Sequence, residues 1–312
     1  MTPSAQDWAE LVRLPAVVSV PGDALVGLAA AGGAAQARAA LLPLASVSMY
    51  WAGMALNDWA DRELDATERP ERPVPSGRVS PAQALAAAGA LTAASVGIAG
   101  LAAGRRGAGV ATVLGVAVWT YDLLGKPTRF APLSMALTRT LDVVLGATGG
   151  AATTRGRGSG WAVLPALAAG LHTLAVTDLS RGEVHGAAGA DAGRATATTL
   201  LAAGAVVPVL LGRLARTSGP AASRRSVVAG TVGSALTTAA LVMHTGPLVS
   251  AQRVAGRTGT GPDARHATVT GIRAFLPLQS ALLAALGRPG QAVALTGLGT
   301  GAARLLRGGS PT

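Results

Sequence analysis

The protein has 312 residues, of which 50% are hydrophobic and only 13% are charged. Soluble domains carry roughly 25% charged residues, and the mean hydropathy here is +0.43, so an ordinary soluble fold is disfavoured. The absence of cysteine excludes disulfides and thiolate metal sites. The net charge of +11 does not indicate nucleic-acid binding, because the arginines are scattered between apolar stretches and only 3% of the residues are aromatic.

The apolar residues fall in separate stretches of about 17–25 residues, each long enough for a helix to cross a bilayer. Clusters of Pro and Gly mark most of the breaks between them. The high Ala and Gly content suits close helix packing in lipid. We therefore expect a single all-α domain over residues 1–312, a polytopic membrane protein of about nine transmembrane helices. The predicted spans are residues 13–33, 40–58, 81–103, 108–124, 131–151, 161–178, 196–215, 226–245 and 267–287.

The charges are distributed unevenly with respect to these spans. Lys and Arg divide evenly between the two sides, so the positive-inside rule does not settle the orientation. All fifteen Asp and Glu residues, in contrast, lie in segments of one side or in spans near it. Acids placed only for solubility would occupy both sides, so we expect this side to carry a functional site.

The densest group of acids directly follows the second predicted span, in Asn57-Asp58-x-x-Asp61-x-x-x-Asp65. Spacings of three and four place the aspartates on one helical face, where like charges repel unless a cation neutralises them. Oxygen ligands at this density suit Mg²⁺, which completes its shell with water and a substrate phosphate. We predict that all four residues bind metal and that the aspartates are catalytic. A solvated helix end with mixed charges is the alternative.

A second polar group follows the span 161–178 and includes Asp178, Arg181 and Glu183. The span count places it on the same side as the first. Asp178 and Glu183 are five residues apart and splay on a straight helix, and nearby glycines indicate that the helix frays there. We predict that both acids bind metal and that Asp178 is catalytic, so that the two groups clamp a diphosphate and its metals. A polar loop between spans is the alternative.

Lys126 is the only lysine in the sequence and lies in Tyr121-Asp122-Leu-Leu-Gly-Lys126. The composition of the chain strongly favours arginine over lysine, so we expect that Lys126 is retained because an ammonium group is required there. A compact point charge suits a phosphate oxygen, so we predict a catalytic contact with an anionic substrate. A lysine that only reaches the membrane interface is the alternative.

Several polar residues fall inside otherwise apolar spans. Arg139 and Asp142 are three apart and share a helical face, so they form a structural ion pair or Arg139 grips a diphosphate. Asp23 requires a partner that the sequence does not identify. His172 and His244 are isolated, and we expect them to be packed or hydrogen-bonded rather than metal ligands.

Together these motifs resemble the UbiA superfamily of intramembrane prenyltransferases, over roughly residues 8–286. The most specific part is the Asn57–Asp65 pattern, which matches the family's first metal motif, and residues 69–77 resemble its continuation. Residues 121–126 resemble the loop after the fourth helix, whose lysine contacts the diphosphate. The resemblance implies nine helices around a central cavity, dependence on Mg²⁺, and a site open to the cytoplasm. Further diphosphate contacts are then expected from Arg72, Arg139, Arg181 and Tyr121.

The second motif departs from the usual family pattern, in which two aspartates end in a form like Asp-x-x-Gly-Asp. Here Glu183 replaces the second aspartate, and the surrounding residues are more similar to the EboC-like branch. This difference leaves the acceptor and the outcome of the reaction open. The prenyl chain length and the oligomeric state are not specified by the sequence either.

The motifs and the resemblance predict an enzyme that ionises an allylic prenyl diphosphate with Mg²⁺ and transfers the prenyl group to an unidentified small-molecule or lipid acceptor. The bias towards Ala, Gly and Arg indicates GC-rich coding and hence a bacterial cell membrane. A terpene cyclase of the same scaffold, in which the substrate's own double bonds capture the cation, is the first alternative. A carrier, transporter or non-catalytic assembly partner is the second, although no inverted repeat of broken helices is visible.

Overall fold

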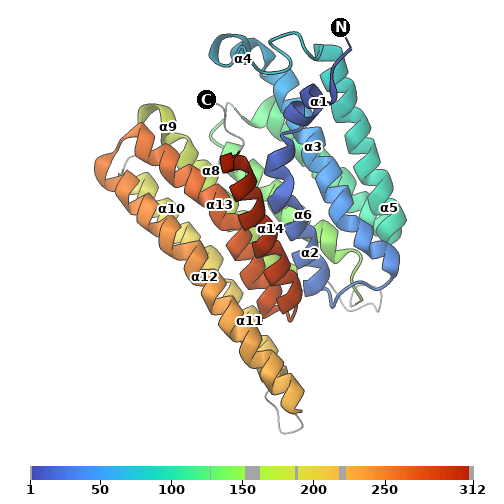
Figure 1. The fold of residues 1–312 in the computed structure, drawn as a ribbon, viewed down its shortest axis with the longest axis vertical. Coiled ribbons are helices and arrows are strands. Elements are labelled where there is room, and N and C mark those ends of the chain that lie inside the picture. The colour runs from blue at the N-terminus through green and yellow to red at the C-terminus, as the bar shows by residue number, and fades with distance from the viewer. Residues whose placement is uncertain (1, 127, 152–161, 187–188, 218–222, 309–312) are drawn as a thin grey trace.

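The computed structural model describes residues 2–126, 128–151, 162–186, 189–217 and 223–308, and within these ranges it contains helices and no β-strand (Figure 1). The helices lie side by side and form one bundle. Their bounds are α1 Ala5–Leu11, η1 Leu14–Ser19, α2 Val20–Ala30, η2 Ala37–Leu41, α3 Leu42–Ala60, α4 Arg62–Glu68, α5 Pro81–Thr120, η3 Tyr121–Gly125, α6 Ala131–Ala147, α8 Val163–Ser180, α9 Gly182–His185, α10 Gly189–Gly204, α11 Val206–Thr217, α12 Arg224–Thr258, α13 Gly261–Ala285 and α14 Pro289–Gly308.

Each predicted span coincides with helix in the described part of the chain. Helix α5 contains two spans, because its backbone leaves the helical path at Gly104, with φ 66° and ψ −153°. The indole Nε1 of Trp119 donates to Thr92 Oγ1 at 3.1 Å, so the two halves of α5 run antiparallel. The predicted spans 81–103 and 108–124 are therefore the arms of one helical hairpin. The structure adds α14 after the last predicted span, and α14 packs against α13.

Small residues let the backbones of α2 and α6 touch. A Cβ atom at Gly146 would overlap the carbonyl group of Ala24, and one at Gly27 would overlap the carbonyl group of Val143. This is the close packing that lipid-embedded helices achieve with small side chains. The contact fixes α2 against α6, and both helices carry polar residues of the bundle interior.

A charged junction fixes α1 at the end of the bundle. The Arg78 guanidinium lies 2.7 Å from Asp7 Oδ1 and 2.7 Å from Glu10 Oε2. Asp7 also completes a capping box with Ser4, and the Ser4 hydrogen bonds, together with Arg78, lower the pKa of the Asp7 carboxyl. The hydrogen bonds to Glu10 and Asp7 raise the pKa of Arg78. The segment after α4 is thereby tied to the N-terminal helix.

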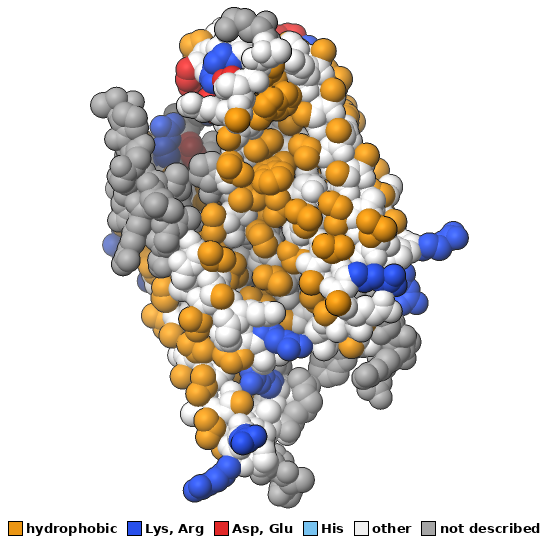
Figure 2. Space-filling model, turned by 45° about the vertical axis from the view of Figure 1, so that its right-hand side comes forward, with side chains coloured by type: hydrophobic (Ala, Val, Ile, Leu, Met, Phe, Trp, Pro, Cys, Tyr) orange, Lys and Arg blue, Asp and Glu red, His pale blue; other side chains and the backbone are white. Residues whose placement is uncertain are grey.

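Six helices of the described residues are long and apolar enough to cross a membrane. Large apolar side chains point outward, for example Leu101, which is 69% exposed. Figure 2 shows hydrophobic side chains covering the face between a charged upper end and arginines below. Because a soluble protein rarely exposes so extended an apolar surface, this face contacts lipid. The prediction of a polytopic helical membrane protein is confirmed.

Candidate active site

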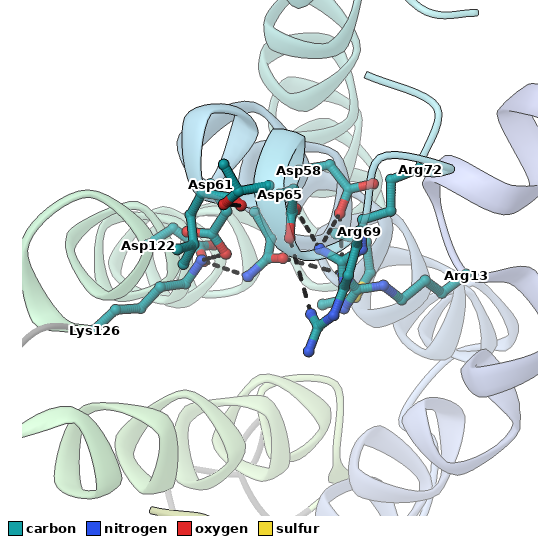
Figure 3. Close-up of polar contacts among 12 residues, drawn as sticks. Arg13, Asp58, Asp61, Asp65, Arg69, Arg72, Asp122 and Lys126 are labelled. Atoms are coloured by element: carbon teal, nitrogen blue, oxygen red, sulfur yellow. Dashed lines mark hydrogen bonds and ion pairs between the residues drawn. The ribbon is translucent and has the colours of Figure 1, made fainter. Parts of the chain in front are cut away.

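The first acidic motif lies where α3 passes into α4. Asp61 separates the two helices, with φ −87° and ψ 4°, yet its N–H still donates to the Asn57 carbonyl at 2.9 Å. The N–H of Asp65 donates in turn to the Asp61 carbonyl at 2.8 Å. The helical path is thus almost continuous, and it brings Asp58, Asp61 and Asp65 together at one end of the bundle, as the spacing predicts (Figure 3).

Arginines of the following loop contact two of these carboxylates. Arg72 Nη1 lies 2.5 Å from Asp65 Oδ2 and 3.5 Å from Asp58 Oδ1, so one guanidinium bridges both acids. Arg69 approaches Asp65 from the same side at 3.9 Å. The side chains of Asp58 and Asp65 are only 3% and 2% exposed, and burial of two charges at this depth requires such compensation.

Arg13, which sequence reasoning missed, also belongs to this site. Its Nη2 atom donates to Asp58 Oδ1 at 3.0 Å and to Asn57 Oδ1 at 3.1 Å. Its backbone has φ 49° and ψ 52°, a left-handed conformation that costs roughly 1–3 kcal/mol in residues other than glycine. Such strain is often found at functional sites. The available sequence signal was an arginine at the edge of the first apolar span.

Lys126 enters the site from the opposite side (Figure 3). Its Nζ atom lies 2.9 Å from Asp61 Oδ2 and 3.0 Å from Asp122 Oδ1. Asn57 Nδ2 donates to the same Asp122 oxygen at 3.3 Å. The preceding turn is π-helical, because the Lys126 N–H donates to the Tyr121 carbonyl five residues back, at 3.1 Å. Insertions of this kind in helices are frequent at functional sites.

These contacts define a charged cluster in which acids and bases alternate. It contains four carboxylates and four cationic side chains, namely Asp58, Asp61, Asp65, Asp122, Arg13, Arg69, Arg72 and Lys126. Among the described residues, no three Asp, Glu, His or Cys side chains are grouped so that they could hold a metal ion in this arrangement. The carboxylate oxygens nevertheless have the hard-donor chemistry that Mg²⁺ requires, and Asn57 adds a neutral oxygen.

The second motif is held by arginines of other helices. Asp178, near the end of α8, lies 3.6 Å from Arg194 of α10. Glu183, in α9, lies 3.6 Å from Arg265 of α13. Within the described ranges, no hydrogen bond or ion pair joins these two acids to the charged cluster. The structure therefore brings the first motif and Lys126 together, but it does not bring the second motif into contact with them.

The second motif lies at the same end of the bundle as the first. Figure 1 shows α9 and α4 both towards its upper end. In addition, Arg181 Nη1 donates to the carbonyl of Arg129 at 3.5 Å, in the loop that begins with Lys126. Predicted diphosphate contacts from Arg181 and Lys126 thus come from neighbouring segments, while Arg72 lies within the charged cluster.

Arg139, also predicted to contact diphosphate, lies in a buried network instead. Its Nε atom lies 3.1 Å from Asp23 Oδ2, and its guanidinium stacks 4.3 Å from the Phe275 ring centroid. Gln279 Nε2 donates to the other Asp23 oxygen at 2.7 Å. Asp23 is fully buried, so Arg139 supplies the partner that the sequence left unidentified. The structural ion pair that we considered for Arg139 is therefore formed with Asp23.

Asp142 and the two buried histidines have partners of their own. Ser46 donates to Asp142 Oδ2 at 2.6 Å. His172 Nε2 faces the Gly271 carbonyl at 3.1 Å, and His244 Nδ1 faces the Ala274 carbonyl at 3.0 Å. The two imidazole rings lie 5.0 Å apart, so both histidines are packed and hydrogen-bonded as expected.

The fold and the site together define a class: a polytopic helical membrane protein with a charged cluster at one end of its bundle. The model of the UbiA prenyltransferase family matches residues 21–255. The chain therefore belongs to the UbiA prenyltransferase family, as its motifs indicate.

Curated relatives match shorter segments. The digeranylgeranylglyceryl phosphate synthase of Natronomonas pharaonis is 40% identical over 88 residues, which cover 28% of this chain and 32% of the relative. The protoheme IX farnesyltransferase of Anaeromyxobacter sp. is 43% identical over 90 residues, which cover 27% of this chain and 30% of the relative. The chain thus spans about a third of the length of these relatives.

Solved structures match nearly the whole fold. A UbiA homolog from Aeropyrum pernix K1 gives a TM-score of 0.60 at 18% identity and covers 86% of this chain and 96% of that one. A UbiA homolog from Archaeoglobus fulgidus bound to GPP and Mg²⁺ gives 0.55 at 15% identity and covers 86% and 99%. At these identities the likeness shows the fold.

Proposed function

We propose that the protein transfers a prenyl group from an allylic prenyl diphosphate to a small-molecule or lipid acceptor, in a reaction that depends on Mg²⁺. The observation that carries this proposal is the alternation of carboxylates and cationic side chains in the charged cluster. Each carboxylate is within ion-pair distance of a cation, so the cluster can accept a diphosphate together with its metal ions by an exchange of partners. Family membership supports the same activity.

When the diphosphate and its metal ions bind, each side chain of the charged cluster exchanges its ion-pair partner for a ligand of opposite charge. Lys126, Arg72 and Arg13 move from carboxylates to phosphate oxygens, for which an ammonium and forked guanidinium groups are well suited. The freed oxygens of the first motif would then hold Mg²⁺, and Asp178 and Glu183, at the same end of the bundle, would add further ligands. When bound, Mg²⁺ supplies charge neutralisation for the departing diphosphate. Metal ligands are therefore proposed at Asn57, Asp58, Asp61, Asp65, Asp178 and Glu183.

The chain's own residues assist the cleavage of one bond. The allylic carbon–oxygen bond breaks, the electron pair leaves with the diphosphate, and an allylic cation remains. Cationic side chains that face the diphosphate stabilise its growing negative charge in a site of low dielectric constant. An electron-rich carbon or heteroatom of the acceptor then bonds to the cation and releases a proton. A central cavity within the bundle would keep water from the cation.

We place the charged cluster at the cytoplasmic face of a bacterial cell membrane. A diphosphate headgroup is then delivered from the aqueous side, while the prenyl tail enters the apolar bundle. All acids of the chain lie at or near this side in the predicted topology, which supports a single polar entrance. The names of the two relatives, a digeranylgeranylglyceryl phosphate synthase and a protoheme IX farnesyltransferase, support the proposed prenyl transfer.

The test uses purified protein with MgCl₂, GPP or DMAPP, and a lipid extract as the source of acceptors. Asp61→Asn and Lys126→Met should each lower the rate of diphosphate release by about 10²–10³-fold, the usual cost of losing a group that stabilises a transition state. Glu63→Gln is the matched control, because this acid of α4 is 88% exposed and should leave the rate unchanged. Full activity of Asp61→Asn would contradict the proposal, and a cyclic hydrocarbon formed without acceptor would identify a cyclase instead.

A further inference from the structure

An open groove of about 450 Å³ lies on the outside of the bundle between α10 and α12, separate from the charged cluster. Its α12 positions recur every three or four residues, so they follow one face of that helix. Its lining combines three apolar side chains with two guanidinium groups, and the guanidinium groups lie towards the C-terminal end of α12. Its lining residues are Leu200, Thr245, Gly246, Val249, Ser250, Arg253, Val254 and Arg257.

The polar end of the groove is formed by Arg253 and Arg257, one turn apart on α12 and both exposed. Neither guanidinium forms an ion pair or hydrogen bond within the described part of the chain. The neighbouring acids of α9 and α10 are already paired, Glu183 with Arg265 and Asp191 with Arg194. Two adjacent positive charges without an acidic partner favour an external anion.

The rest of the groove extends along α12 from Ser250 to Thr245, away from the arginines. Leu200 of α10 is 50% exposed, and Val254, between the two arginines, is 43% exposed; a Cβ atom at Gly246 would meet no atom within 4 Å. The twelve steps from Thr245 to Arg257 span roughly 18 Å at 1.5 Å per residue. Because α12 has 35 residues and is roughly 52 Å long, it is longer than a hydrocarbon core of about 30 Å, and the predicted span 226–245 leaves its last turns outside that core. The arginines therefore lie on the water side of the core, and Gly246 lies at its edge.

We infer that this groove binds an anionic phospholipid of the surrounding bilayer. The lipid phosphate lies between Arg253 and Arg257, with Ser250 available as a hydrogen-bond donor, and one acyl chain follows α12 past Gly246. A free phosphate ion would gain only two exposed ion pairs, which contribute little in water. A phospholipid gains these ion pairs and also buries apolar acyl-chain surface along the groove. The shape and the charge of the groove therefore suit an anionic phospholipid.

The experiment is native mass spectrometry of the full chain, released from mixed micelles that contain equal phosphatidylglycerol and phosphatidylcholine. The wild type should retain phosphatidylglycerol preferentially. Arg253→Gln/Arg257→Gln should weaken this binding about 30-fold (roughly 2 kcal/mol), as expected for two interfacial arginines. Arg224→Gln/Arg225→Gln, with the same loss of charge at the other end of α12, should leave it unchanged.

A second variant tests the acyl-chain part of the groove without changing charge. Gly246→Phe, or Gly246→Leu, should fill the open space and abolish phosphatidylglycerol retention while leaving thermal unfolding and diphosphate release unchanged. Equal retention of both lipids, or unaltered retention in Arg253→Gln/Arg257→Gln, would overturn the inference. Displacement by millimolar inorganic phosphate would identify a simple anion site, and stronger displacement by GPP would identify a substrate site. Either of these results would also overturn it.

Discussion

Replacement of Arg139 by glutamine should destabilise the bundle severely, because it leaves a buried carboxylate without its counter-charge. Asp23 is fully buried and its Oδ2 lies 3.1 Å from Arg139 Nε. At an effective dielectric constant of about 20, two charges at this distance attract by about 5 kcal/mol. Loss of one partner of a buried pair typically costs about 3–5 kcal/mol, so we expect Arg139→Gln to lower the free energy of unfolding by that amount.

The assay is SDS-induced unfolding in mixed micelles, followed by tryptophan fluorescence. In a double-mutant cycle, Asp23→Asn/Arg139→Gln should recover most of the loss, because both charges are then absent. Arg38→Gln, in the exposed part of η2, is the control and should stay within about 0.5 kcal/mol of the wild type. If Arg139→Gln proves as stable as the wild type, the buried ion pair is not a structural element and the reasoning is refuted.

Two further predictions concern packing and pH. Gly146→Ala should cost about 1–3 kcal/mol by forcing α2 from α6, whereas Gly97→Ala, whose Cβ meets no atom within 4 Å, should stabilise α5 by about 0.5–1 kcal/mol. Melting temperatures compare the two variants, and equal values would contradict the close contact. The pKa of Asp7 is lowered below 3.8, so its contribution is complete above this pH and is lost as the pH falls through the lowered pKa. Hydrogen exchange of α1 amides should therefore accelerate only in strong acid, and an Asp7→Asn variant should lack this response.

The positions of the helices were predictable, because apolar length and Gly or Pro breaks depend on local sequence. The count of nine spans differs from the six described helices that are long and apolar enough to cross a membrane. Even the hairpin within α5 followed from the interruption between two apolar stretches. The proximity of Asp58, Asp61 and Asp65 was also predictable, since helical periodicity alone places them on one face. Contacts between segments far apart in the sequence could not be predicted from such local patterns.

Arg13 and Arg139 illustrate the reason. Both are arginines at or within apolar spans, and the sequence does not specify which carboxylate each will meet. Arg13 reaches Asp58 over 45 positions, and Arg139 selects Asp23 over Asp142, although the latter is only three residues away. Such choices depend on how α2, α3 and α6 pack, and the close backbone contacts at Gly27 and Gly146 fix the approach of α2 to α6.

The π-helical turn at Tyr121–Gly125 has a consequence for how this chain can vary. A turn that closes over five residues contains one residue more than a regular helix would need. Its deletion would restore ordinary pitch and rotate everything beyond it by about 100°, which would carry the chain's single ammonium group away from Asp61. The direction of the Lys126 side chain therefore depends on the number of residues in this turn as well as on their identity. An insertion or deletion here would alter the site even if every residue of the motif were retained.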